Sequence, residues 1–417
     1  MLDQYVQALQ DRVENQTLRS LRSCAPAGNG EIEINGKRLV NFSSNDYLGL
    51  SQHPALAERS IEFVKKYGTG SGASRLLSGN LDAFEKIEQK LADLKGAEAA
   101  LILPSGFQAN CTVLAAALAK NSIVAADRLV HRSIIEGLQL SSSNWFRYKH
   151  NDLEDLEQQF ERKSQGLDQK PETGKPASNS RSKKRRRIQN VSSDLSTESI
   201  PKWIVTESVF SMDGDACKID DLLFSAAKRG FALFIDEAHA TGVTGENGMG
   251  MTAGKEFSGI SMGTFGKALG SFGAYVCCSK LMREYLVNFC SGLIYSTALP
   301  PAVLGAIDAA LDIVPEMDEE RLTLAANAEY LRNALKKMGF DTGGSTTQII
   351  PIILGSEESA LALCGYLEEN GFCVPAIRPP TVPAGSARLR ISLSAVHSLE
   401  QIDQFLSLVR SWHEKKN

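Results

Sequence analysis

The chain of 417 residues lacks several features that would place it in a class at once. It has no run of about 18 or more apolar residues, the length that a membrane-spanning helix requires. Its N-terminal stretch, MLDQYVQALQDRVENQ, has polar residues throughout and no apolar core of a secretory signal. The 45 Lys and Arg nearly balance the 49 Asp and Glu, so no overall basic field favours nucleic acid. These absences predict a protein that binds neither membrane nor nucleic acid.

Patterns for disulfides, zinc and nicotinamide cofactors are also missing. The eight cysteines are scattered and none forms a C-x-x-C pair, so we expect no disulfide framework and no metal site. Disulfides are rare in reducing compartments, and this cysteine usage therefore favours the cytoplasm. No G-x-G-x-x-G turn follows an early strand, which argues against a nicotinamide enzyme.

What the sequence does contain is an alternation of helical and extended patterns from about residue 80 to residue 290. In LDAFEKIEQKLADLKG, apolar residues recur at steps of three and four, which predicts a helix capped by Asn80 and ended by Gly96. AALILPSG, KWIVTES and FALFIDEA have the length and apolar content of buried strands. Such strands between helices predict an α/β fold with a mostly parallel sheet covered on both faces.

The pattern changes after about residue 292. TTQIIPIIL and ARLRISLSA are typical of strands, and ESALALCGYLEENG and LEQIDQFLSLVRSWHEKK of helices. We therefore expect an N-terminal segment (1–44), a large domain (45–291) and a smaller C-terminal α+β domain (292–417).

Residues 162–200 interrupt the large domain with a stretch rich in Ser, Lys, Asn and Pro. Few large apolar residues are available for burial, so we predict a disordered insertion. Six of the seven residues 181–187 are basic, which leaves a nucleic-acid or localisation patch as one reading. A solvated loop is the reading that we favour, because long loops add little closure entropy.

The stretch TFGKALGSFGAY places Lys267 among glycines. Glycine lets the backbone approach a ligand closely, which favours a lysine that forms a Schiff base over a surface lysine. Asp236 closes an apolar strand, where it is either a helix N-cap or a carboxylate that faces a cation. An acid opposite a pyridine nitrogen and a Schiff-base lysine together indicate pyridoxal phosphate.

Other residues match the needs of such a cofactor. PSGFQAN follows a strand and precedes an apolar helical run, so its backbone N–H groups are suited to a phosphate. A plain turn would look similar. Thr264 offers a hydroxyl for the phosphate, His131 an imidazole to stack on the ring, and His239 a donor to its phenolic oxygen.

Several motifs in series extend this interpretation. The chain resembles the α-oxoamine synthase family of fold-type-I pyridoxal-phosphate enzymes from about residue 17 to residue 412, the insertion excepted. The motifs that carry the resemblance are NFSSNDYLGL, GTGSGASRLLSGN, LPSGFQAN, ADRLVHRS, TESVFSMDGD, DEAHATG, TFGKALGSFGAY, IYSTALPP and IRPPTVPAGSARLRISLSAVH.

The resemblance implies a role for each matching residue. Lys267, Asp236, His131 and His239 would be the catalytic residues. Those that would bind the cofactor are Ser105, Gly106, Phe107, His131, Glu207, Ser211, Asp236, His239, Thr264, Lys267 and, for the neighbouring subunit's phosphate, Thr297. Those that would bind substrate are Arg19 or the nearby Arg22, Asn45, Thr381 and Arg390, whose planar fork suits the amino-acid carboxylate.

The resemblance also implies a homodimer with active sites at the interface and a decarboxylative condensation of an amino acid with an acyl thioester. IRPPTVPAG most resembles the members that condense L-alanine with pimeloyl-CoA or pimeloyl-carrier protein. The alternative within the family is a glycine C-acyltransferase that uses a short acyl-CoA.

Overall fold

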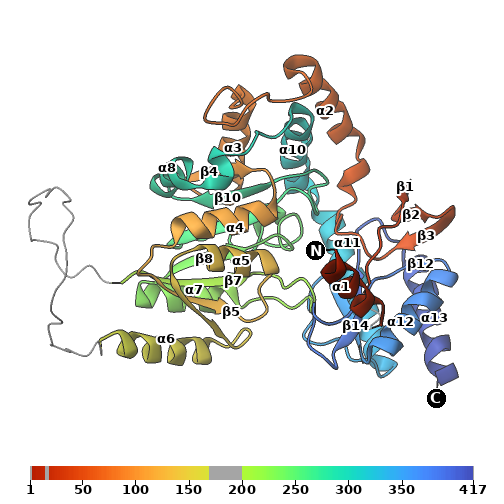
Figure 1. The fold of residues 1–417 in the computed structure, drawn as a ribbon. Helices are drawn as coiled ribbons and strands as arrows, with labels where there is room; N and C mark the ends of the chain where they lie inside the picture. The colour runs from red at the N-terminus through yellow and green to blue at the C-terminus, as the bar shows by residue number, and fades with distance from the viewer. Residues whose placement is uncertain (1, 15–17, 169–199, 417) are drawn as a thin grey trace, which may run out of the picture.

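Parallel strands alternating with helices form the larger part of the molecule (Figure 1). The structure, a computed structural model, describes residues 2–14, 18–168 and 200–416. The main sheet has the order β4-β10-β9-β8-β7-β5-β6. Its strands are Ala99–Leu103 (β4), Ile123–Asp127 (β5), Asn144–Tyr148 (β6), Lys202–Glu207 (β7), Ala232–Asp236 (β8), Gly259–Thr264 (β9) and Ala274–Cys278 (β10). Only β10 runs antiparallel to its neighbours, so the predicted α/β fold with a mostly parallel sheet is confirmed.

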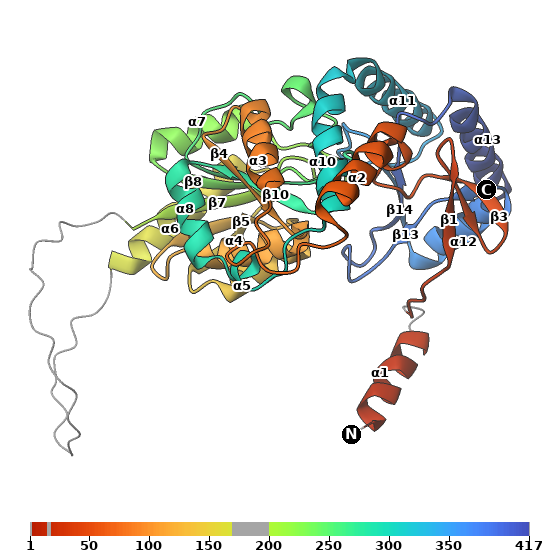
Figure 2. The ribbon, with the colours of Figure 1, turned by 90° about the horizontal axis from the view of Figure 1, so that it is seen from above.

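Helices cover both faces of this sheet (Figure 2). One face carries α4 (Gly106–Ala117), α5 (Arg132–Leu140) and α8 (Lys280–Phe289), and the other α3 (Asp82–Lys95), α6 (Leu153–Asp168) and α7 (Ile219–Arg229). Successive side chains of β5 alternate between the faces: Val124 packs in the cluster of α4 and α5, and Ile123 in that of α6 and α7. Burial on both faces explains why the strands are apolar without interruption.

The start of α3 differs from the prediction. Leu81, not Asn80, is the N-cap residue, and it makes no side-chain cap. The Asn80 side-chain oxygen instead accepts a hydrogen bond from Arg75 Nε at 2.8 Å. The end of α3 is as predicted, because Gly96 adopts the left-handed conformation (φ 65°) that ends a helix without strain.

A smaller unit contains antiparallel β11 (Ile349–Gly355), β14 (Ala387–Ser392) and β13 (Ala376–Ile377) with α11 (Asp318–Lys337), α12 (Glu357–Glu369) and α13 (Leu399–Lys416). Three N-terminal strands, β1 (Cys24–Gly28), β2 (Glu31–Ile34) and β3 (Lys37–Asn41), form a sheet in this order, and β3 pairs with β12 (Phe372–Cys373) from this unit. In addition, α10 (Pro301–Ile313) packs on α2 (Pro54–Tyr67) of the larger unit. Contacts thus cross the expected limits at 44 and 292, and the division into three segments remains a prediction.

The remaining elements are short or peripheral. They are α1 (Asp3–Glu14), α9 (Ser291–Ile294) and the 3-10 turns η1 (Leu50–Gln52), η2 (Glu246–Gly248) and η3 (Val314–Glu316). In Figure 2, α1 projects away from the body, and none of its residues is buried. Helix α6 continues to Asp168 and so occupies the start of the range expected to be disordered. The rest of that range, 169–199 with the basic run 181–187, lies outside the described residues. Within the described ranges, no helix combines the length and the apolar character needed to cross a bilayer.

Candidate active site

The carboxyl ends of neighbouring strands bring the predicted site residues to one edge of the sheet. Glu207 ends β7 and Asp236 ends β8, and the two residues are direct partners in the sheet register. Thr264 ends β9, next to β8. They line a cavity of about 210 Å³ together with His131, from the loop after β5, and Lys267, from the loop after β9. This is the edge at which open α/β sheets bind ligands.

Asp236 is a buried carboxylate held entirely by neutral donors. Its Oδ1 accepts the backbone N–H of Ala238 at 2.9 Å, and its Oδ2 accepts Asn110 Nδ2 at 2.7 Å. Only 4% of Asp236 is exposed, and none of the ion pairs in the described part of the chain includes it. A buried charge without a partner is costly, so the site is suited to a ligand that brings a cation.

Lys267 ends a chain of polar side chains that begins at Asn45. The Tyr47 hydroxyl donates to Asn45 Oδ1 at 3.1 Å and lies 2.6 Å from His239 Nδ1. His239 Nε2 is in turn 2.6 Å from Lys267 Nζ. Since the tyrosine proton is engaged by Asn45, His239 Nδ1–H donates to Tyr47, and His239 Nε2 accepts from Lys267.

Burial favours the uncharged forms of both Lys267 and His239. It lowers the pKa of Lys267 to about 8, although the Asp236 and Glu207 carboxylates favour the ammonium form. The pKa of His239 lies well below its ordinary value because of burial and the nearby Lys267 charge. A large fraction of Lys267 is therefore the free amine at pH 8, the form that attacks an aldehyde or takes up a proton.

The start of α4 offers an anion site at the other end of the cavity. Ser105 is the N-cap residue, and its Oγ accepts the Gln108 N–H at 3.2 Å. Gly106 and Phe107 line the cavity. Their backbone N–H groups lie in the first turn of α4 and therefore have no acceptor within the helix. A Cβ on Gly106 would lie 3.8 Å from Thr264, so the two residues flank one space. Helix-start amides suit a phosphate. The Thr264 hydroxyl donates to the Gly273 carbonyl at 2.8 Å, so it would have to rotate to donate to that phosphate.

Ser133 and Glu207 hold His131 in place at the wall of the cavity. The Ser133 N–H donates to His131 Nδ1 at 3.3 Å, which fixes the ring at the start of α5. The backbone N–H of His131 donates to Glu207 Oε1 at 2.5 Å. Burial and the Asp236 charge raise the pKa of Glu207 well above its ordinary value.

Arg390 belongs to strand β14 and lies beside Asn45. Its side-chain hydrogen bonds to the described residues go to neutral oxygens. Its Nε donates to the Ser211 carbonyl at 2.5 Å, Nη1 to Ser392 Oγ at 2.7 Å and Nη2 to Asn45 Oδ1 at 3.2 Å. A guanidinium carries about five N–H donors, so two are left after these three bonds, and the Tyr47 hydroxyl is a further hydrogen-bonding neighbour of the group. The structure thus brings Arg390, Asn45 and Ser211 together, with Ser211 contributing its carbonyl rather than its hydroxyl.

Seven predicted residues are not part of the lining of the cofactor cavity: Ser105, Asn45, Ser211 and Arg390, whose contacts are given above, and Thr297, Thr381 and Arg19. Thr297 is exposed and bridges to Ser74. Thr381 is exposed in the loop before β14, and Arg19 is exposed before β1. Arg22 is held in an ion pair with Glu368 at 2.7 Å.

Comparison with known proteins agrees with this geometry. The sequence model of the family described as "Aminotransferase class I and II" matches residues 37–409. The chain belongs to the aminotransferase class I and II family. A Gluconacetobacter diazotrophicus protein named 8-amino-7-oxononanoate synthase is 45% identical over 90% of this chain and 88% of its own length. A Desulfosudis oleivorans protein, provisionally given the same name, is 48% identical over 97% of both.

Solved structures show the same fold. The 8-amino-7-oxononanoate synthase of Francisella tularensis is 28% identical, with a TM-score of 0.70, over 91% of this chain and 98% of its own. Sphingomonas wittichii serine palmitoyltransferase is 26% identical, with a TM-score of 0.84, over 100% of this chain and 98% of its own. A further neighbour is described as serine palmitoyltransferase with a pyridoxal-phosphate internal aldimine. This family member is therefore an acyl-transferring enzyme that depends on pyridoxal phosphate, as the sequence predicted.

The residues present fit that cofactor. Among the described residues, Asp236 lacks a cationic partner, and the backbone N–H groups of Gly106 and Phe107 lack an acceptor. The buried Asn110 Oδ1 has no hydrogen-bond partner in the described structure. The predictions from sequence omitted Asn110 and Tyr47, which hold Asp236 and His239. Both residues stand in motifs that were recognised, PSGFQAN and NFSSNDYLGL, but nothing local reveals partners more than a hundred residues away.

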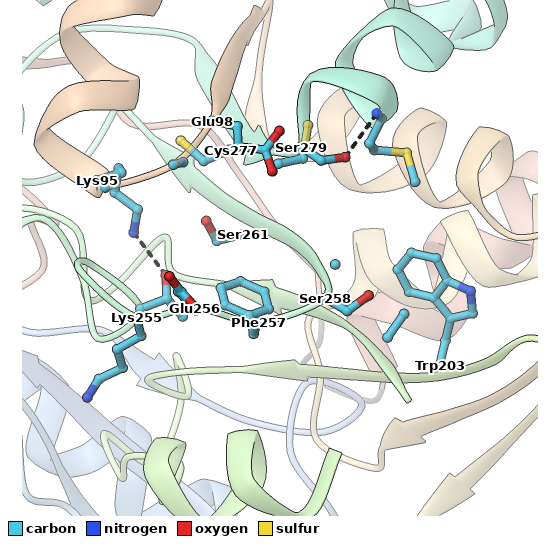
Figure 3. Close-up of a pocket in the computed structure, with 17 residues that line it drawn as sticks. Lys95, Glu98, Trp203, Lys255, Glu256, Phe257, Ser258, Ser261, Cys277 and Ser279 are labelled. Atoms are coloured by element: carbon cyan, nitrogen blue, oxygen red, sulfur yellow. Dashed lines mark hydrogen bonds between the residues drawn. The ribbon is translucent and has the colours of Figure 1, made fainter. Parts of the chain in front are cut away.

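A second, larger cavity lies at the opposite ends of the strands (Figure 3). It has a volume of about 760 Å³, and its walls include Trp203 near the start of β7 and Gly259 at the start of β9. Lys95 lies in its wall, where Nζ donates to Thr252 Oγ1 at 3.1 Å and forms a fully buried ion pair with Glu237. Because Glu237 directly follows Asp236, this ion pair anchors the active-site turn, the segment that follows β8.

Proposed function

We propose that the protein condenses L-alanine with a pimeloyl thioester and releases 8-amino-7-oxononanoate, CO₂ and the free thiol, as a step of biotin biosynthesis in the cytoplasm. The observation that carries the proposal is the 45% identity to an 8-amino-7-oxononanoate synthase over nearly the whole chain. The donors left on Arg390 add a site for the amino-acid carboxylate.

In this proposal, three residues of the cavity act on the cofactor and on the amino acid. Lys267 Nζ would hold the cofactor, and its free amine would take the proton from the amino acid's α-carbon. The Asp236 carboxylate would pair with the cofactor's ring nitrogen, and the His131 imidazole would lie against the ring. When bound, pyridoxal phosphate supplies the electron sink for a carbanion at that carbon.

The other residues orient the reacting groups. His239 Nε2 accepts a hydrogen bond from Lys267, which directs the nitrogen lone pair before the cofactor arrives. His239 Nε2 would have to release Lys267 before it could form the predicted hydrogen bond to the phenolic oxygen of the ring. Arg390 and Asn45 hold the substrate carboxylate until it departs as CO₂. Thr381 and Arg19 remain our proposals for the thioester.

A homodimer completes the proposed site. Several large apolar side chains of this chain are exposed near the cavity: Phe107 at its wall, Phe272 after Lys267, and Tyr295 close to Thr297. A second copy would cover them and bring its Thr297 hydroxyl to the phosphate. Measurement of the mass in solution should give twice 45.2 kDa.

Serine palmitoyltransferase activity is the second candidate, because those neighbours superpose at TM-scores of 0.84–0.86. Thiol release with alanine, serine or glycine, each combined with pimeloyl-, palmitoyl- or acetyl-CoA, separates the candidates. We expect turnover with alanine and pimeloyl-CoA. Preference for serine with palmitoyl-CoA, or for glycine with acetyl-CoA, would reject the proposed substrates.

A further inference from the structure

A histidine outside the cofactor cavity connects two loops on which the site depends. His150 follows β6 and lies between two carboxylates. Its Nδ1 is 3.0 and 3.1 Å from the Oδ1 and Oδ2 atoms of Asp127, and its Nε2 is 2.7 Å from Asp215 Oδ2. The ring packs edge-on against Phe210, with centroids 4.4 Å apart and planes at 89°. His150 therefore bridges the end of β5 to the segment after β7. The neighbouring Asn151 adds neutral bonds to the same carboxylates: its backbone N–H donates to Asp127 Oδ2 and its Nδ2 to Asp215 Oδ2, both at 2.8 Å.

The first carboxylate organises the loop that carries His131. Asp127 is completely buried at the end of β5, four residues before His131. Its Oδ1 also accepts the Leu129 N–H at 2.8 Å, which shapes the turn between β5 and α5. Any shift of Asp127 would therefore move the loop that presents the His131 ring to the cavity.

The second carboxylate belongs to the loop that holds Arg390. The Asp215 carbonyl accepts the Phe210 N–H at 3.0 Å, and the Phe210 carbonyl accepts the Gly214 N–H at 2.9 Å, so residues 210–215 form a closed turn. The Ser211 carbonyl in this turn accepts from Arg390 Nε. The guanidinium thus contacts the turn that contains Asp215, which the Arg388–Asp213 ion pair also holds.

The charge on His150 is needed for both contacts. Two ring nitrogens donate to two carboxylates only when the imidazole is protonated. Burial alone would lower the pKa of His150, but the hydrogen bonds and charges of Asp127 and Asp215 raise it to about 10. Two further titratable groups near the carboxylates stay neutral, because burial raises the pKa of Cys217 to about 12 and that of Tyr148 well above its ordinary value. Asp213, in the same turn as Asp215, is paired with Arg388.

We infer that His150 is a positioning residue: its imidazolium ties loop 127–131 to turn 210–215 and so aligns His131 and Arg390. The inference rests on the proposed role of Arg390 at the amino-acid carboxylate. It does not depend on which amino acid is the substrate, because every candidate carries the same carboxylate.

The test uses the holoenzyme and the variants His150→Gln and Asp215→Asn. Glutamine offers an amide donor at one end only, so it can hold one loop but not both. Amino-acid binding is followed by the change in absorbance of the bound cofactor on titration with L-alanine, without thioester. We expect the dissociation constant to rise about tenfold or more in His150→Gln, since small displacements of a positioned group have effects of that order. The KM for the thioester should not change.

Lys149→Gln is the matched control. Lys149 precedes His150, is exposed and pairs only loosely with Asp155 (3.8 Å), so the control removes a neighbouring positive charge without touching the cluster. Its affinity for L-alanine should equal that of the wild type.

The pH dependence separates positioning from a merely structural role. A pKa near 10 keeps His150 protonated at pH 7–9, so the wild-type affinity should not vary through loss of this proton. In Asp215→Asn one of the two stabilising carboxylates is neutral, the pKa of His150 falls, and affinity for L-alanine should decrease as pH rises from 7 to 9.

Three results would overturn the inference: wild-type affinity in a folded His150→Gln protein, an unchanged pH profile in Asp215→Asn, or a loss of stability without loss of affinity. If His150→Gln does not fold, the Asp215→Asn profile alone decides. If no amino acid perturbs the wild-type cofactor, the proposed function fails instead. His150 is then judged by cofactor affinity, which should fall in both variants through His131 and stay at the wild-type value if the inference is wrong.

Discussion

Arg390→Gln should weaken amino-acid binding selectively. The three contacts of Arg390 within the protein go to neutral oxygens, so its positive charge is left for a ligand. Its two remaining N–H groups would form charge-assisted bonds to a carboxylate, and their loss costs about 3 kcal/mol. At about 1.4 kcal/mol for each factor of ten, the dissociation constant for L-alanine should rise roughly a hundredfold.

The assay is the same absorbance titration of the holoenzyme, combined with the KM for the thioester. Arg321→Gln provides a control, because Arg321 is a similarly buried arginine in α11 whose guanidinium contacts Val314, Pro315 and Asp318 rather than the site. Equal losses in both variants would point to general destabilisation. A loss for the thioester rather than for L-alanine would refute the role of Arg390.

Three other changes test the remaining parts of the site. Asp236→Asn should retain cofactor but lower turnover by about a hundredfold or more, because electrostatic stabilisation of the carbanion is lost; steady-state rates near those of the wild type would contradict the pairing. In the cofactor-free protein, the rate of cofactor capture should increase with pH around a midpoint near 8, since only the neutral amine of Lys267 reacts and its pKa is lowered to about 8; stopped-flow absorbance would reveal a flat profile if the lysine is not the acceptor. Lys95→Ala should reduce the free energy of unfolding by about 3–5 kcal/mol, because Glu237 is left as an unpaired buried charge; a urea midpoint equal to that of the wild type would show that the pair does not anchor the active-site turn.

Much of the site could be predicted from sequence because its signals are local. Lys267 stands in a glycine-rich turn, and Asp236 ends an apolar strand, so each can be recognised within about ten residues. The order of parallel strands then places Glu207 beside Asp236, since carboxyl ends of parallel strands meet at one edge.

What could not be predicted depends on contacts between distant segments. Tyr47 reaches His239 across 192 residues, and Asn110 reaches Asp236 across 126. His150 likewise gains its significance only when two loops from different strands close around it. The start of α3 likewise differs from the prediction, since Asn80 bonds to Arg75 and Leu81 is the N-cap residue.

The most direct test of the account is borohydride reduction of the purified holoenzyme followed by peptide mass spectrometry. Reduction should fix the cofactor to the nitrogen of Lys267 and bleach the absorbance of the bound form. A cofactor label on another lysine, or a protein that takes up no pyridoxal phosphate, would contradict the central claim.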